Sequence, residues 1–69
     1  MAQTLGELRV RVGFNPGGNE TVNHIKRMSA NLIDLVEELK VDSETARLVA
    51  LAQTHYEDAA MWAVKAATA

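Results

Sequence analysis

The sequence predicts an all-α fold: an antiparallel helical hairpin with a short N-terminal arm or helix, assembled into a compact homo-oligomer. Two long stretches repeat apolar residues every three or four positions, as amphipathic helices do. A link of about four residues joins them, so the two helices should fold back on each other. The 69 residues include no cysteine, which excludes disulfides and thiolate metal sites as supplements to so small a core. Association with further copies is the remaining route to stability.

Residues 1–69 form a single domain, in which residues 1–18 are an N-terminal arm and turn. Leu8 to Phe14 alternates apolar and basic residues, which is the period of a strand. A short helix at Thr4–Val10 followed by extended chain fits the same residues, and both conformations stay open. The arm ends in the turn sequence NPGG at residues 15–18.

The second segment, residues 19–40, is predicted to be a helix from about Glu20 to Leu39. Asn19 suits its N-cap, and Glu20 suits the positive end of the helix dipole. Apolar residues at spacings of three and four form one stripe and make the helix amphipathic; they are Val22, Ile25, Met28, Leu32, Leu35 with Val36, and Leu39.

The third segment, residues 42–68, is predicted to be a helix from about Glu44 to Ala67, capped by Asp42 or Ser43. Two adjacent rows of this helix are almost entirely apolar. One row is Leu48, Ala52, His55, Ala59, Trp62 and Ala66, and the other is Val49, Gln53, Tyr56, Ala60, Ala63 and Ala67. So wide an apolar surface exceeds what one partner helix covers, so further copies of the chain are expected to bury it. The alternative is a long, partly exposed, alanine-rich helix.

Charge and hydropathy exclude several classes of protein. The net charge of −2 argues against a DNA-binding protein, and no apolar stretch approaches the ~20 residues that span a membrane. The N-terminus lacks the pattern of a signal peptide, so we expect a soluble protein. The first half nevertheless holds Arg9, Arg11, Lys26 and Arg27 against few acids, which suits a local anion site or simply solvates helix faces.

The sequence does not predict an enzyme. Catalysis needs a nucleophile with a base, a carboxylate pair or a metal. On a helix, His55 and Asp58 share a face but Glu57 lies on another, and His24 is distant. We therefore expect no catalytic residues, no metal and no cofactor. His55 is expected to be a packed, hydrogen-bonded residue of its apolar row.

A basic and aromatic segment is the strongest binding candidate. Arg9-x-Arg11-x-x-Phe14-Asn15 precedes Lys26 in the chain. An aromatic ring stacks on a nucleobase for ~1–3 kcal/mol, asparagine hydrogen-bonds base edges, and lysine or arginine holds phosphate. The alternative is that Phe14 plugs the open end of the hairpin, and the residues alone do not decide between the two.

Two stretches carry a family resemblance. One is RVGFNPGGN at residues 11–19, running into the second segment, and the other is residues 46–65 with the pattern T-x-x-E-x-A-x-M-W at 54–62. Together they resemble the phage anti-CBASS sponge family, small proteins that sequester cyclic-nucleotide messengers of bacterial immunity. The resemblance implies a homohexamer of helical hairpins in the cytoplasm of the infected bacterial host.

The resemblance also implies a set of ligand contacts. Cyclic dinucleotides bind at subunit interfaces, where Phe14 would stack on the bases and Lys26 would meet phosphate. Asn15 and Arg11 are the further candidates for contacts with base or phosphate. The family aromatic is often tyrosine, and phenylalanine keeps its stacking face without the hydroxyl. Cyclic trinucleotides bind in separate pockets, for which the candidates are Lys65, Ser29 and Arg27.

A hypothesis from another class competes with sequestration. A small oligomeric phage structural or adaptor protein, with no small-molecule ligand, would also be alanine-rich and self-associating. Such a protein would have no use for an exposed Phe14, so the role of this residue separates the two hypotheses.

Overall fold

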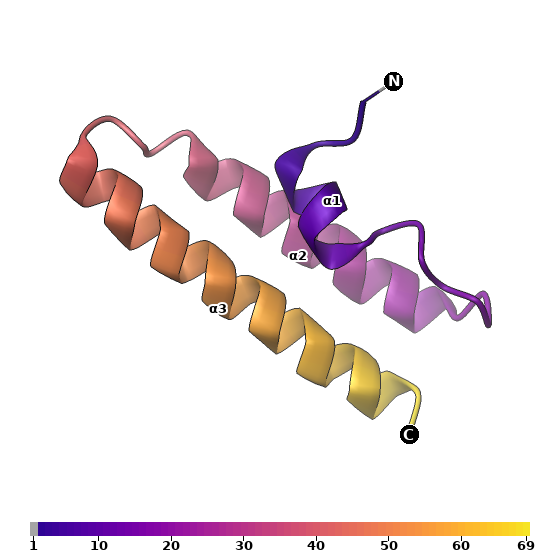
Figure 1. The fold of residues 1–69 in the computed structure, drawn as a ribbon. Coiled ribbons are helices and arrows are strands. Elements are labelled where there is room, and N and C mark those ends of the chain that lie inside the picture. Colours follow the sequence, from indigo (N-terminus) through magenta and orange to yellow (C-terminus); the bar gives the residue numbers. More distant parts are fainter. Residues whose placement is uncertain (1) are drawn as a thin grey trace.

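A computed structural model describes residues 2–69, which form three helices and no strand (Figure 1). The helices are α1 (Leu5–Val10), α2 (Glu20–Glu37) and α3 (Ser43–Ala67). Figure 1 shows α2 and α3 running antiparallel as a hairpin, with α1 packed mainly on α2. The all-α hairpin predicted from the sequence is confirmed, and the arm contains a short helix rather than a strand.

Helix α1 forms because its first turn carries a complete capping box. The Thr4 hydroxyl accepts a hydrogen bond from the Glu7 amide at 3.1 Å, and the Glu7 carboxylate accepts one from the Thr4 amide at 2.8 Å. The helix ends at Arg11, which adopts the left-handed conformation with φ 54°. The chain reverses there, so Val10 and Val12 both turn inward. The alternation that suggested a strand thus arises from a helix end followed by a turn.

Gly6 lets α1 approach α2 closely. A Cβ atom at this position would lie 2.8 Å from the carbonyl carbon and the Cα of Ala30, and closer still to its carbonyl oxygen. The Gly6 amide also donates a hydrogen bond to Asp34 Oδ1 at 2.7 Å. Backbone contact and hydrogen bond together fix where α1 sits on α2.

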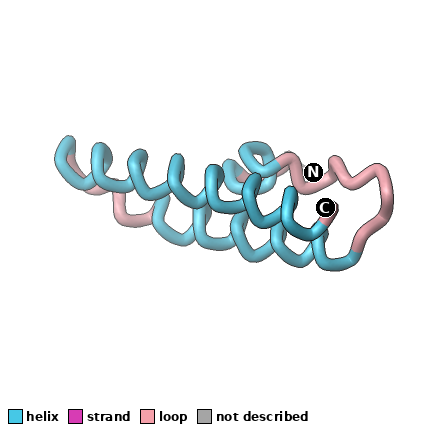
Figure 2. Tube along the Cα trace, turned by 90° about the horizontal axis from the view of Figure 1, so that it is seen from below, coloured by secondary structure: helices cyan, strands magenta, loops and turns pink. Residues whose placement is uncertain are grey.

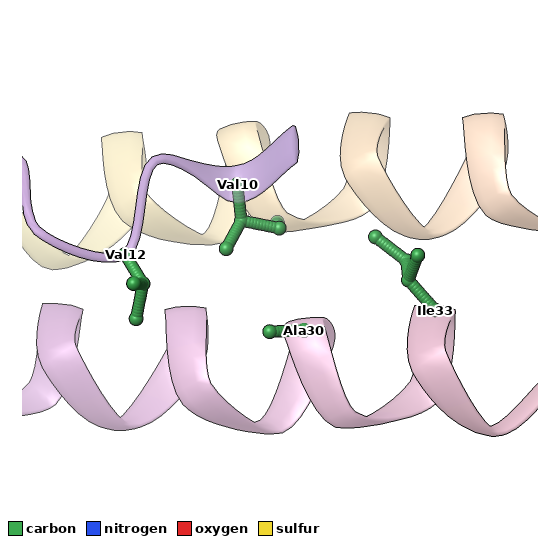
Figure 3. Close-up of a cluster of buried hydrophobic side chains, with 5 residues drawn as sticks. Val10, Val12, Ala30 and Ile33 are labelled. Atoms are coloured by element: carbon green, nitrogen blue, oxygen red, sulfur yellow. The ribbon is translucent and has the colours of Figure 1, made fainter. Parts of the chain in front are cut away.

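The core lies where the three helices meet. Val10 and Val12 point toward Ala30 and Ile33 of α2, as Figure 3 shows, and Ala60 of α3 completes the cluster. Farther along the hairpin, the buried Gln53 amide donates to the Ile33 carbonyl at 3.0 Å and to Glu37 Oε1 at 2.8 Å. These two hydrogen bonds link α3 to α2 and satisfy the buried amide group of Gln53.

The predicted apolar stripe of α2 is not the face that packs inside the hairpin. The inward face is Val22, Lys26, Ala30 and Ile33. Of the predicted stripe only Val22 is buried and Ile25 and Val36 are half-buried, whereas the rest, Met28, Leu32, Leu35 and Leu39, are 42–61% exposed. At 100° per residue these side chains lie almost opposite the inward face. Helix α2 therefore has one face that packs inside the hairpin and an opposite apolar face that is exposed in the protomer. The helix ends at Glu37 and not at Leu39, the end that the sequence predicts.

Helix α3 divides its two apolar rows in the same way. The row of Val49, Gln53, Tyr56, Ala60, Ala63 and Ala67 is buried or half-buried, whereas most of the other row faces outward, with Trp62 63% exposed. His55 belongs to the outward row and is exposed, so the expectation of a packed histidine is wrong within one protomer. Asp42 is the N-cap, and its carboxylate accepts from the Thr45 amide at 2.8 Å.

None of the described helices combines the length and the apolar character needed to cross a membrane.

Candidate anion-binding site

The loop of residues 11–19 lies at one end of the hairpin, beside the C-terminal end of α3 (Figures 1 and 2). Two asparagines give the loop its shape. The Asn15 side chain donates to the Asn19 carbonyl at 2.7 Å and accepts from the Asn19 amide at 3.2 Å. Asn19 in turn caps α2, as predicted, by accepting from the Val22 amide at 3.0 Å. The loop is therefore held by hydrogen bonds of its own.

Lys26 anchors this loop from the inward face of α2. Its side chain is only 4% exposed, and its Nζ donates to the carbonyl oxygens of Arg11 at 3.0 Å and Phe14 at 2.5 Å. An ammonium group has three N–H donors, so these carbonyls leave one N–H for another acceptor. Burial lowers the pKa of Lys26, and the nearby charge of Arg11 lowers it further.

Phe14 lies on the outside of the loop. Its ring is 63% exposed, and the Lys26 Nζ lies 5.5 Å from the ring centroid. Within the protomer this ring does not plug the end of the hairpin. It offers an aromatic face next to a cation, which is the combination that binds a nucleobase and its phosphate.

Two cavities flank the pair of Phe14 and Lys26. The first, called here the loop cavity, measures about 500 Å³; the second, called the arginine cavity, measures about 360 Å³. Both volumes fall in the usual range of small-molecule sites. The loop cavity is lined by Phe14, Asn15, Pro16, Gly17, Asn19, Val22, Lys26, Val64 and Thr68. The arginine cavity is lined by Arg9, Val10, Arg11, Phe14, Lys26, Glu57, Met61 and Val64.

The arginine cavity concentrates positive charge in an acidic chain. Three of its lining residues, Arg9, Arg11 and Lys26, are cations, and one, Glu57, is a carboxylate. Arg9 Nε donates to Glu57 Oε1 at 2.7 Å. With three cations and one carboxylate, the net charge of this lining is about +2, which suits an anion. Three of the four cations that suggested an anion site from the sequence, Arg9, Arg11 and Lys26, thus line one cavity, whereas the fourth, Arg27, does not.

The four candidates for a cyclic dinucleotide gather around these cavities. Phe14 and Lys26 line both, Asn15 lines the loop cavity, and Arg11 lines the arginine cavity. Sequence reasoning missed Glu57 as a cavity residue because its partner Arg9 is 48 positions away. Arg9 belongs to the basic and aromatic segment predicted from the sequence, although it is not one of the four predicted ligand contacts.

Within the described residues, no hydrogen bond or ion pair joins the three candidates for a cyclic trinucleotide to one another. Arg27 pairs with Glu7 across 3.6 Å, Ser29 is half-buried on α2, and Lys65 holds its Nζ 5.2 Å from the Trp62 ring centroid on α3. None of the three lines the loop cavity or the arginine cavity.

The cavity residues suit capture of an anion. They offer an ammonium group, guanidinium groups, one aromatic ring and a carboxylate that is already paired. Among residues 2–69, no three histidine, aspartate or glutamate side chains gather into a group that could hold a metal ion.

Fold and cavities together define a small helical-hairpin protein with two cavities lined by basic and aromatic residues. The family model of the Acb2/Tad1 hairpin domain matches residues 6–68, nearly the whole chain. The chain therefore belongs to this family, the anti-CBASS protein 2 family, and the resemblance seen in the sequence is confirmed. No curated protein and no solved structure gives a significant match to it.

Proposed function

We propose that this chain binds and sequesters cyclic dinucleotides without degrading them, and so blocks CBASS anti-phage signalling in the infected bacterial host. The observation that carries the proposal is an exposed aromatic ring and a buried ammonium group side by side between two cavities. Membership of the Acb2/Tad1 family supports the same assignment.

Each residue of the site has a distinct role in this proposal. Phe14 stacks on a base, and the remaining N–H of Lys26 donates to a phosphate oxygen. Arg11 adds a second cation in the lining of the arginine cavity. One amide N–H of Asn15 holds the loop, which leaves the other to contact the ligand. Because Lys26 is held by two carbonyls before the ligand arrives, little side-chain entropy is lost on binding.

A homo-oligomer, a hexamer by family resemblance, completes the proposal. The outward apolar side chains of both long helices support it, because a second copy offers a matching surface of the same kind. These side chains are Met28, Leu32 and Leu35 on α2 and Leu48, Leu51 and Trp62 on α3. Closure of the cavities by a neighbouring subunit would slow release of the ligand, which a sponge requires.

Cyclic trinucleotides are proposed to bind in separate pockets between subunits. Lys65 beside Trp62 would supply a cation and an aromatic face from one protomer. Ser29 and Arg27 on α2 would come from another, since Lys65 lies on α3 and Arg27 is paired with Glu7 in its own protomer.

The role of Phe14 tests the proposal. A Phe14→Ala variant is expected to bind cyclic dinucleotides about 5 to 150 times more weakly, because the lost stacking is worth ~1–3 kcal/mol. Its assembly is expected to be unchanged, because Phe14 lies in the loop and not among the outward apolar side chains of α2 and α3 that we propose form the interface. Calorimetry measures the first effect, and light scattering measures the second.

A Phe14→Tyr variant is the matched control, because it keeps the ring and should keep the affinity. If Phe14→Ala instead loses assembly or unfolds, the ring is a structural plug. The chain is then better described as a structural or adaptor protein with no small-molecule ligand.

The proposed role of Lys26 predicts a pH dependence. Its pKa lies below the ordinary value of 10.5, and a phosphate beside it favours the charged form. We therefore expect the affinity for a cyclic dinucleotide to fall as the pH rises through this lowered pKa, at a pH below 10.5. Calorimetric titration at increasing pH measures this loss.

Deprotonation of Lys26 is not expected to unfold the protein, so the loss of affinity would not be a consequence of alkaline unfolding caused by this group. In this pH window the unfolded chain still holds the lysine proton that the folded chain has lost, so this group makes the free energy of unfolding rise with pH. Circular dichroism at each pH provides the control. An affinity that stays constant up to pH 10.5 would remove Lys26 from the binding site.

A further inference from the structure

The outward apolar face of α2 has the spacing of a helix that packs along a second helix. Its apolar residues, called here the outer seam, alternate intervals of three and four; they are Ile25, Met28, Leu32, Leu35 and Leu39. This alternation is the heptad spacing of coiled coils. Within the protomer most of the outer seam is uncovered, because all its members except Ile25 are 42–61% exposed.

A groove on the outer seam has the form of a helix-packing hole. It measures about 270 Å³ and is lined by Met28, Asn31, Leu32 and Leu35. These residues are positions i, i+3, i+4 and i+7 of one helix, and four residues of this kind surround the inserted side chain in knobs-into-holes packing. Because a single helix forms the groove, it fits a side chain from a second helix.

The polar residues beside the outer seam favour a second copy of α2 that runs in the opposite direction. His24, Asn31 and Glu38 are exposed and lie seven residues apart, so they share one edge of the seam. In an antiparallel pair with its two-fold axis beside Asn31, His24 of each copy faces Glu38 of the other. An imidazole N–H can donate to a carboxylate, so these two contacts are complementary. A parallel pair would bring equal residues to the same level and lose both contacts.

Asn31 suits a position beside a two-fold axis. It is exposed, and it is the one polar residue in the lining of the groove. Its amide group carries both a donor and an acceptor, so two copies related by the axis can exchange hydrogen bonds. One polar residue within an apolar helix pair is a known means of fixing register and orientation.

The protomer leaves the outer seam accessible. Helix α1 reaches α2 on another side, where Gly6 contacts the Ala30 backbone and donates to Asp34 Oδ1 at 2.7 Å. Helix α3 packs on the inward face, where Gln53 donates to the Ile33 carbonyl at 3.0 Å. A second copy can therefore cover the outer seam without displacing either helix.

We propose that two copies of this chain pair through α2, antiparallel along the outer seam, with the two-fold axis beside Asn31. Ile25 of each copy then packs near Leu35 of the other, and Met28 packs near Leu32. The inference rests on the oligomer of the proposed function. It adds which helix pairs with which, in what direction and in what register.

Introduced thiols test the pairing, because the chain has no cysteine of its own. A short bis-maleimide is expected to link most of an Asn31→Cys variant into a dimer of twice the 7.5 kDa chain mass on a denaturing gel. His24→Cys and Glu38→Cys are each expected to stay unlinked, because equal positions would lie about 21 Å apart along the pair. A variant with both of these substitutions is expected to link, because each His24 position meets a Glu38 position.

Asn23→Cys is the matched control, because it places a thiol at an exposed residue of α2 outside the outer seam and should stay unlinked. All four substituted positions are exposed, so each variant is expected to fold, and circular dichroism checks this.

The pattern of links decides the inference. Links at Asn31 and in the double variant, with none in either single end variant, support it. Links in both His24→Cys and Glu38→Cys alone would mean a parallel pair, and no link at Asn31 would mean that another surface covers the seam. Either result overturns the inference. Titration of the wild type with cyclic dinucleotides reports the proposed function separately, so ligand capture can stand where this pairing fails.

Discussion

A Gly6→Ala variant is expected to lose most of its folding stability and, with it, the binding site. The added Cβ would lie 2.8 Å from the Ala30 carbonyl carbon and Cα, which are backbone atoms of a helix and cannot rotate away. Such overpacking costs about 1–3 kcal/mol, and a core of this size rarely supplies more than about 3–5 kcal/mol. Thermal unfolding followed by circular dichroism should show a midpoint lower by roughly 4–8 °C for each kcal/mol.

The effect on ligand binding follows from the same contact. Helix α1 places Arg9 and Val10 in the lining of the arginine cavity and leads directly into Arg11. Displacement of α1 would therefore move all three residues out of that lining. Gly13→Ala is the matched control, because a Cβ there meets nothing within 4 Å and its melting should be unchanged. Equal midpoints for the Gly6 and Gly13 variants would mean that α1 does not pack on α2 as described.

A Leu35→Glu variant is expected to fail to assemble. Leu35 is 61% exposed on the outward face of α2, so the substitution changes little within one protomer. In an oligomer that covers this face, each copy would bury an unpaired carboxylate, at a cost of several kcal/mol per ion. Light scattering should therefore report a mass near that of the 7.5 kDa chain instead of a multiple of it.

An exposed position on the polar side of α2 supplies the control for assembly. Asn23→Glu adds the same charge at an exposed polar residue of the same helix and should assemble like the wild type. If Leu35→Glu also assembles like the wild type, α2 does not pack in the interface by this face. A wild-type protein that is already monomeric would contradict the proposed oligomer altogether.

The N-terminal ends of the two long helices could be predicted from local chemistry. Asn19 and Asp42 cap α2 and α3 as their positions suggested, because a capping side chain bonds to amides only a few residues away. The inward face of α2 could not be predicted in this way. It includes Lys26 in place of an apolar residue, and the more hydrophobic stripe of Met28, Leu32 and Leu35 faces outward. Hydrophobic periodicity finds an apolar face but does not say which partner covers it.

Only part of the cavity lining could be predicted from residue type, and its geometry could not. Arg11, Phe14 and Lys26 stood out by residue type, and all three line the arginine cavity. The carbonyl partners of Lys26 were not foreseeable, because they depend on a left-handed turn at a non-glycine residue, Arg11. The contact between Arg9 and Glu57 joins opposite ends of the chain, and only the folded hairpin brings them together.

The most direct test of capture without chemistry is calorimetric titration of the purified protein with cyclic di- and trinucleotides. The bound ligand is then released by heating the protein and identified by chromatography. We expect tight binding of a cyclic dinucleotide and recovery of the same molecule intact. Recovery of a cleaved ligand would make the protein an enzyme, and no binding to any of these ligands would leave the cavities beside Phe14 and Lys26 without the proposed role.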